Sequence, residues 1–438
     1  MKFEDFKLKE PIYKAILKEG YEVPTPVQEQ TINKIIEGND ILGCAQTGTG
    51  KTAAFALPLL HLLLDNPSKE SIHSIKALIL TPTRELAIQI RDNFRTFGEN
   101  TNIKTSVIFG GVNQHSQVEV LRKGIDVLVA TPGRLLDLIN QGHVRLENTK
   151  YLVLDEADTM LDMGFLQDVK KIVARVPKGH QTMLFSATMP KEIEKLSQEF
   201  LNNPTIVKVS IVSSAVDTIT QNLYYIDKVN KVKLLIQLLN KEEVVSALVF
   251  TRTKHGANKL GELLDKAGIN SGIIHGNKSQ PARVSALKDF KEGKTKVLIA
   301  TDIAARGIDI NALSHVINYD MPEKAETYVH RIGRTGRAGV TGISISFCDY
   351  DEKPIIKEIE KLIKQQITVI DDHDYPMTQL FKTEKKQGGR SSKPRSFGAP
   401  YEKKKSFNHQ NKKSSYGNNS NSNGSYNKRT RGKTNFQK

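Results

Sequence analysis

The 438-residue sequence has only two cysteines and lacks a long apolar run. Cys44 and Cys348 are too few for a disulfide framework or a four-ligand zinc site, so we assign neither a function. A bilayer-spanning helix needs about 18 consecutive apolar residues, which this chain does not have, and its first residues lack the apolar core of a signal peptide. These absences predict a cytoplasmic protein with no membrane partner.

Acidic residues are scarce at the end of the chain. The formal net charge is +16, and residues 378–438 carry +14 of it, from sixteen Lys or Arg and two Glu. This excess suggests a polyanionic partner that is met mainly by the tail. The rest of the chain is nearly neutral, and the overall hydrophobic content of 38% is enough for two or three domain cores.

The segment 43–52, with the sequence GCAQTGTGKT, lies between an apolar run and a helix-forming run. Such a strand, loop and helix can bind phosphate: Gly48 and Gly50 let backbone N–H groups turn inward, Lys51 reaches the outer phosphates, and Thr52 can ligate Mg²⁺. A glycine-rich turn without a ligand is the alternative. The residues expected to contact the nucleotide are Ala45, Gln46, Thr47, Gly48, Thr49, Gly50, Lys51 and Thr52.

Upstream of this loop, two prolines hold Gln28 in a fixed position after Tyr21. A glutamine amide matches the donor and acceptor on the edge of adenine, and the tyrosine ring offers a face for stacking. A capped turn with a surface glutamine is the alternative for this stretch by itself.

Apolar runs alternate with helical patterns after the loop, and almost every run ends in polar or glycine residues. This alternation predicts an α/β fold with a parallel sheet, in which ligands gather at the shared carboxyl edge of the strands. The runs are 77–80, 105–109, 127–130, 151–154 and 183–185.

Asp155 and Glu156 directly follow the run 151–154. A carboxylate at this strand end can position Mg²⁺, and the neighbouring carboxylate can polarise the attacking water. Ordinary strand ends also carry acidic residues, which is the alternative.

A second series of strand-like runs follows, at 247–250, 272–274, 297–300, 315–318 and 343–347, without a second GxGKT sequence. Arg331, Arg334 and Arg337 lie within seven residues of one another. We therefore expect this part of the chain to complete the first site by bringing arginine across a cleft to the transferring phosphoryl group. A basic helix end is the alternative.

Seven motifs follow one another along the chain. They are Ala45–Thr52, Asp155-Glu156-Ala157-Asp158, Ser186-Ala187-Thr188, Thr251-Arg252-Thr253, His275-Gly276 with Gln280 and Arg283, Thr301–Asp309, and His330–Arg337. Together with the Gln28 segment, this series resembles the DEAD-box ATP-dependent RNA helicases of superfamily 2 over about residues 3–350, and most of all their bacterial RhlE-type members.

The resemblance implies two RecA-like parallel-sheet domains in tandem, followed by a disordered basic tail. Residues 1–209 would form the ATP-binding domain, 210–217 a hinge, 218–377 the second domain and 378–438 the tail. ATP and Mg²⁺ are the implied cofactors.

The resemblance also implies a role for each matched residue. Lys51, Asp155, Glu156, Arg334 and Arg337 would be catalytic, with Thr52 and Asp155 holding the metal, Tyr21 and Gln28 the adenine, and Asp309 the ribose. Ser186, Thr188 and His330 would couple hydrolysis to strand separation. RNA would lie on Arg84, Gly111, Thr131, Arg134, Arg283 and Thr301, through backbone contacts with little base specificity.

The tail combines basic residues with isolated aromatics and has too few apolar groups to fold. It suits loose RNA contact by charge and stacking, and a tail that serves only solubility is the alternative.

Two functions share every residue named above. One is a helicase that opens short RNA duplexes locally, and the other is an ATP-gated RNA clamp or remodeller of RNA–protein complexes. The Gln28 segment and the DEAD sequence argue against a DNA translocase or another phosphate-loop ATPase. We expect a monomer.

Overall fold

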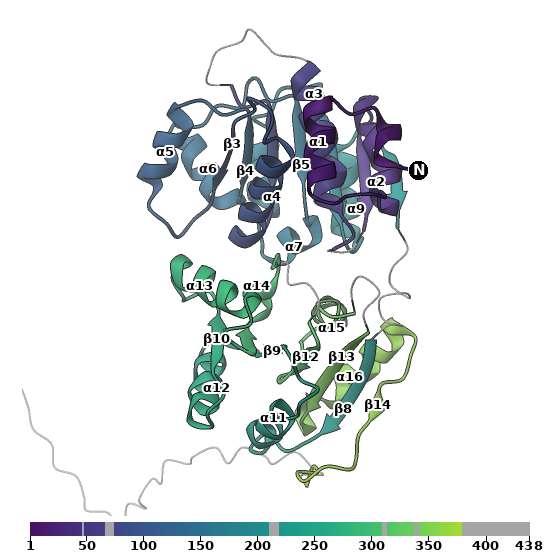
Figure 1. The fold of residues 1–438 in the computed structure, drawn as a ribbon, viewed down its shortest axis with the longest axis vertical. Helices are drawn as coiled ribbons and strands as arrows, with labels where there is room; N and C mark the ends of the chain where they lie inside the picture. Colours follow the sequence, from purple (N-terminus) through teal and green to yellow (C-terminus); the bar gives the residue numbers. More distant parts are fainter. Residues whose placement is uncertain (46–47, 66–73, 210–218, 309–312, 337–340, 379–438) are drawn as a thin grey trace, which may run out of the picture. The chain divides into compact units, whose positions relative to one another are not determined.

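The computed structural model describes residues 1–45, 48–65, 74–209, 219–308, 313–336 and 341–378. Within these residues the strands form two seven-stranded sheets in which every strand pair is parallel (Figure 1). The strand orders are β3-β4-β2-β5-β6-β1-β7 and β10-β11-β9-β12-β13-β8-β14. We call the described residues up to 209 the first half and those from 219 the second half.

In the first half, helices connect consecutive strands of the sheet. The strands are β1 (Ile41–Cys44), β2 (Ala77–Leu80), β3 (Thr105–Ile108), β4 (Val127–Ala130), β5 (Tyr151–Leu154), β6 (Gln181–Ser186) and β7 (Thr205–Lys208). The helices are η1 (Phe3–Phe6), α1 (Glu10–Lys18), α2 (Pro26–Ile36), α3 (Lys51–Asp65), α4 (Arg84–Phe97), α5 (Gln114–Arg122), α6 (Pro132–Asn140), α7 (Ala157–Asp162), α8 (Leu166–Val173) and α9 (Lys191–Phe200).

The second half repeats this plan. Its strands are β8 (Ile219–Tyr225), β9 (Ala247–Phe250), β10 (Ser271–Ile274), β11 (Val297–Ala300), β12 (His315–Asn318), β13 (Gly342–Cys348) and β14 (Thr368–Val369). Its helices are α11 (Lys231–Leu239), α12 (Lys254–Lys266), α13 (Gln280–Lys291), α14 (Asp302–Ala305), α15 (Ala325–Ile332), η2 (Tyr350–Glu352) and α16 (Lys353–Ile363).

Alternate residues of the central strands enter different cores. Ala77 and Ile79 of β2 pack in one apolar cluster of the first half, whereas Leu78 and Leu80 pack in another. Successive side chains of a strand point to opposite faces, so β2 is covered on both faces and its four residues are all buried. This burial explains why continuous apolar runs, rather than alternating ones, mark the central strands.

The expected strands are confirmed, with some ends moved by one or two residues. Their parallel pairing brings their carboxyl ends to one edge of each sheet, as expected. The sequence analysis missed β7, β8 and β14. The expected hinge at 210–217 and the tail from 379 onward lie outside the described residues, so the proposed domain boundaries stay predictions. Among the described helices, none is long and apolar enough to cross a bilayer.

Candidate functional site

The phosphate loop connects β1 to α3 as expected. Gly48 and Gly50 both have φ of +89°, a conformation that favours glycine and that a side chain would strain. Lys51 begins α3 and is only 6% exposed; its Nζ donates to the Ala45 carbonyl at 2.9 Å. The Lys51 ammonium group is therefore held against Ala45 at the start of the loop. Gln46 and Thr47 lie outside the described residues.

Gln28 is buried against this loop. It is the third residue of α2, and its Oε1 accepts from the Thr25 backbone N–H at 2.9 Å, which closes a capping box. Its Nε2 donates to the Gly50 carbonyl at 3.1 Å. Gln28 thus links the helix N-terminus to the phosphate loop, a connection that the sequence alone did not reveal.

Tyr21 packs edge-on between Phe3 and Phe97, with ring centroids 5.9 and 5.8 Å away. Its position as an adenine-stacking residue stays a prediction.

Asp155 and Glu156 follow β5 and are 2% and 4% exposed. Burial raises the pKa of Asp155 to about 6, although Lys51, whose Nζ lies 4.0 Å from Asp155 Oδ1, lowers it. Glu156 has a φ of +53°, and its N–H donates to Asp155 Oδ1 at 3.0 Å. Backbone strain of this kind at a buried acidic residue is typical of a functional site.

Asp158 is hydrogen-bonded to residues at the end of β6 and just after it. Its Oδ2 accepts from the Thr188 N–H at 2.8 Å and from the Thr188 hydroxyl at 2.9 Å, and its own N–H donates to Ser186 Oγ at 3.3 Å. Burial lowers the pKa of His330, and Asp158 opposes this shift. The three residues expected to couple hydrolysis to strand separation thus all interact with Asp158.

Arg334 and Arg331 have different environments in the second half. Arg334 is 6% exposed and donates from Nη1 to the Ile308 carbonyl at 3.0 Å. Arg331 is 2% exposed. It donates two hydrogen bonds to the Asp302 carboxylate, from Nε to Oδ1 at 2.6 Å and from Nη2 to Oδ2 at 2.8 Å. Arg331 therefore serves the structure of this half and is not available to a phosphate group. Arg337 and Asp309 lie outside the described residues.

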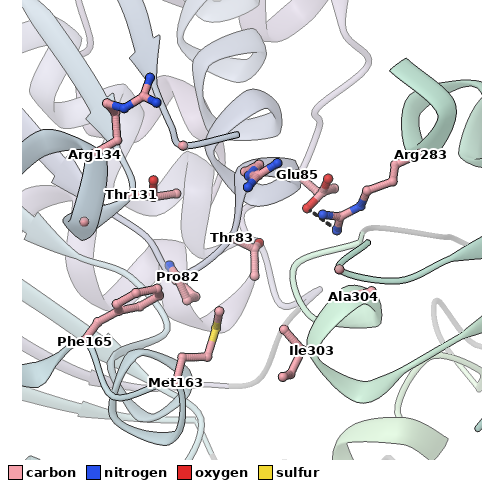
Figure 2. Close-up of a pocket in the computed structure, with 14 residues that line it drawn as sticks. Pro82, Thr83, Glu85, Thr131, Arg134, Met163, Phe165, Arg283, Ile303 and Ala304 are labelled. Atoms are coloured by element: carbon pink, nitrogen blue, oxygen red, sulfur yellow. Dashed lines mark hydrogen bonds and ion pairs between the residues drawn. The ribbon is translucent and has the colours of Figure 1, made fainter. Parts of the chain in front are cut away.

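Four of the six residues expected to bind RNA line one pocket (Figure 2): Arg84, Thr131, Arg134 and Arg283. Burial lowers the pKa of the Arg84 guanidinium, and the charges of Arg283 and Arg134 lower it further. The three arginines outweigh the single carboxylate of Glu85 in the pocket lining, so the pocket keeps a positive charge that suits a polyanion.

The other two residues of this set lie outside the pocket lining. Gly111 lies against Arg84, because a Cβ added to it would be 2.3 Å from the guanidinium nitrogens. Thr301 is the N-cap of α14 and directly precedes Asp302. Apolar side chains also line the pocket, and we did not expect them: Pro82, Met163, Phe165 and Ile303.

Glu85 makes a contact between the halves that the sequence did not predict. Its Oε2 accepts from Arg283 Nη2 at 2.8 Å (Figure 2). Its Oε1 accepts from Gln280 Nε2 at 2.9 Å. Glu85 belongs to α4 and its partners to α13, so these bonds join the two halves. The RNA role of Arg283 stays a prediction, because its guanidinium already holds this carboxylate.

Comparisons with known proteins agree on one family. A model described as DEAD/DEAH box helicase matches residues 25–196, and one described as Helicase conserved C-terminal domain matches residues 230–339. The DEAD-box ATP-dependent RNA helicase CshA of Bacillus subtilis is 43% identical over 365 residues, which are 83% of this chain and 73% of CshA. The ATP-dependent RNA helicase vasa of Drosophila melanogaster is also 43% identical over 365 residues, but they cover only 55% of vasa.

A solved structure of S. cerevisiae Dbp5 bound to RNA and ADP BeF3 matches the fold with a TM-score of 0.76 and 32% identity. The match covers 84% of this chain and 95% of that one. The two parallel sheets are accordingly RecA-like sheets in tandem. From this fold, the motifs and these relatives, the chain belongs to the DEAD-box ATP-dependent RNA helicases.

Proposed function

We propose that ATP binds at the phosphate loop and that RNA in the arginine-lined pocket promotes its hydrolysis by holding the two halves together. The observation that carries this proposal is the pocket itself. Arg84 and Arg134 come from the first half and Arg283 from the second, and all three line it. A polyanion seated there favours the arrangement in which both halves face it, because a ligand shifts a protein toward the state that it binds more tightly.

Chain residues around the nucleotide have distinct tasks in this proposal. Lys51, buried at the start of α3, neutralises phosphate charge, and Glu156 orients the attacking water. Arg334 and Arg337 stabilise the charge that develops on the γ-phosphate. Asp309 contacts the ribose.

The residues at the phosphate loop fit Mg²⁺. Thr52 and Asp155 supply the oxygen ligands that this cation prefers. Burial raises the pKa of Asp155 to about 6 despite the nearby Lys51, so a bound cation would stabilise the charged form of this carboxylate. When bound, Mg²⁺ would screen the charge of the β- and γ-phosphates.

The RNA is held by its backbone in this proposal, so base sequence has little influence. The chain unwinds short RNA duplexes locally and non-processively, and it also remodels RNA–protein complexes. The second candidate function is an ATP-gated RNA clamp in which unwinding is incidental. The chain acts as a monomer in the cytoplasm. The proposal also assigns the chain to the RhlE-type members of the family. The bacterial relative named above, however, is a CshA helicase.

The test is the rate of ATP hydrolysis by the full chain with RNA, with single-stranded DNA and with neither, alongside release of a strand from a short RNA duplex. We expect RNA, but not single-stranded DNA, to stimulate ATP hydrolysis strongly. Strand release from the duplex should require ATP. Equal stimulation by DNA would contradict the proposal. RNA-stimulated hydrolysis without strand release would favour the clamp.

A further inference from the structure

Asp162 ends α7, the short helix that begins directly after Asp155 and Glu156. Its Oδ2 accepts from Arg306 Nη2 at 2.8 Å, and its Oδ1 lies 3.6 Å from Lys324 Nζ. Both cations belong to the second half. One carboxylate at the end of the helix that follows Asp155 and Glu156 therefore meets two basic side chains of the other half.

The two contacts differ in strength. The bond from Arg306 to Asp162 is a charge-assisted hydrogen bond of 2.8 Å, in which the Arg306 side chain is 14% exposed and that of Asp162 is 34% exposed. The side chain of Lys324 is 68% exposed, and an ion pair at that exposure contributes little. Arg306 is the partner that matters.

Arg306 is two residues from the support of Arg334. The chain runs from Arg306 through Gly307 to Ile308, whose carbonyl accepts the 3.0 Å bond from Arg334. Lys324 is the N-cap of α15, the helix that leads toward Arg334. Asp162 thus contacts the segment that accepts the bond from Arg334 and the first end of the helix that leads to Arg334.

Gly307 shows that this turn is seated tightly on the first half. It has a φ of +69°, and a Cβ at this position would lie 2.2 Å from Thr83 Oγ1 and 2.8 Å from Leu86 Cβ. A side chain here would collide with the start of α4. The Asp162–Arg306 bond is therefore made at a close-packed contact rather than between two freely moving surface side chains.

We propose that Asp162 is a positioning residue for Arg334: by holding Arg306 when the halves meet, it places the Ile308 carbonyl and with it the arginine at the nucleotide. This inference rests on the proposed function, in which Arg334 stabilises the transferring phosphate. It predicts that Asp162 acts on the rate of hydrolysis and on RNA-linked closure, and not on the folding of the first half.

The test is Asp162→Asn in the full chain, which keeps the shape of the side chain and removes its charge. We expect kcat at saturating RNA to fall about tenfold and RNA affinity with a non-hydrolysable ATP analogue to weaken. ATP affinity without RNA and the thermal unfolding midpoint should stay as in the unmodified chain. Asp162→Glu, which retains the carboxylate, should recover part of the lost rate.

The matched control is Glu99→Gln. Glu99 pairs with Lys18 at 2.7 Å, and its side chain is 33% exposed against 34% for Asp162, but both partners lie in the first half. This control should leave kcat unchanged. Loss of activity equal in the two variants, or a kcat of Asp162→Asn within twofold of the unmodified chain, would overturn the inference.

A double variant tests the pairing itself. If Asp162 acts through Arg306, the variant Asp162→Asn/Arg306→Gln loses no more activity than Arg306→Gln, whereas independent roles give additive losses. The two proposals can be told apart: an unmodified chain without RNA stimulation contradicts the proposed function, and a stimulated chain that tolerates Asp162→Asn contradicts only this inference.

Discussion

At the scale of single residues, the nucleotide site is built from buried polar groups that the apolar sheet holds in place. Lys51 and Asp155 are almost inaccessible, yet both carry charge-bearing groups next to the loop whose glycines have positive φ. Burial of charge is costly for stability. In the proposed function these groups meet the nucleotide phosphates and the metal, so single substitutions here should alter ATP turnover.

Lys51→Ala should abolish ATP turnover while the chain stays folded. The ammonium group meets the phosphate charge that develops during transfer. In the structure it donates a hydrogen bond to the Ala45 carbonyl of the loop, so its loss removes a loop contact and not an apolar contact of the core. ATP hydrolysis and thermal unfolding of the purified variant check this. A folded variant with near-normal turnover would contradict the assignment of the loop.

Gln28→Ala should narrow the preference for ATP over GTP, because it removes an amide contact to adenine of about 1–3 kcal/mol. It should also raise the KM for ATP, since the bond to the Gly50 carbonyl is lost. Competition between the two nucleotides measures the preference. Gln30→Ala, at an exposed position of the same helix, is the control, and unchanged discrimination in Gln28→Ala would assign the residue a purely structural role.

At the scale of elements, the sequence predicted the strands that are buried on both faces and also the partly buried edge strands β3 and β10, but it missed β7, β8 and β14. Strands such as β4 and β11 are continuous apolar runs. β8 mixes polar residues such as Gln221 and Asn222 with apolar ones, and β7 is an edge strand with an exposed Ile206, so neither has a clear apolar pattern.

The candidate site was predictable where its chemistry is local in sequence, as in the phosphate loop and at Asp155. The Glu85–Arg283 bond joins residues 198 positions apart, and the local sequence around either residue does not predict its partner. The same holds for Asp162 and Arg306. Pairing across long separations depends on how the two sheets meet, which motif spacing does not encode.

The two thiols test the strand placement. Cys348 in β13 is fully buried, and burial raises its pKa to about 12, whereas Cys44 at the end of β1 is partly exposed. The thiolate is the reactive form, so in the folded chain Cys44 should react slowly with a thiol reagent and Cys348 should not react. In Cys44→Ala, labelling is then expected only after unfolding; rapid labelling of the folded variant would contradict the packing of β13.

At the scale of the whole molecule, charge is divided between a nearly neutral body and a basic tail. The last described residue, Thr378, is tied to the second half, because its N–H donates to Asp227 Oδ2 at 3.0 Å and its hydroxyl donates to the same oxygen. A cut after Thr378 therefore removes the basic residues without disturbing this attachment.

A chain ending at Thr378 should bind RNA more weakly and with a flatter salt dependence, since each phosphate neutralised on a single strand contributes a log–log slope of about −0.7. The maximal hydrolysis rate at saturating RNA should hardly change, because Glu156 and Arg334 lie before the cut. Titrations at several salt concentrations check this. Unchanged affinity and slope would reduce the tail to a solubility device, and a collapsed maximal rate would show that it takes part in closure.

The central claim is that one half holds the nucleotide and the other completes the catalytic site. The most direct measurement is the turnover of Arg337→Ala at saturating ATP and RNA. An arginine brought to the transferring phosphate contributes roughly 10³–10⁵ to the rate in related phosphoryl transfers, so we expect turnover to fall by orders of magnitude while ATP affinity without RNA is kept. Turnover within threefold of the unmodified chain would contradict the claim.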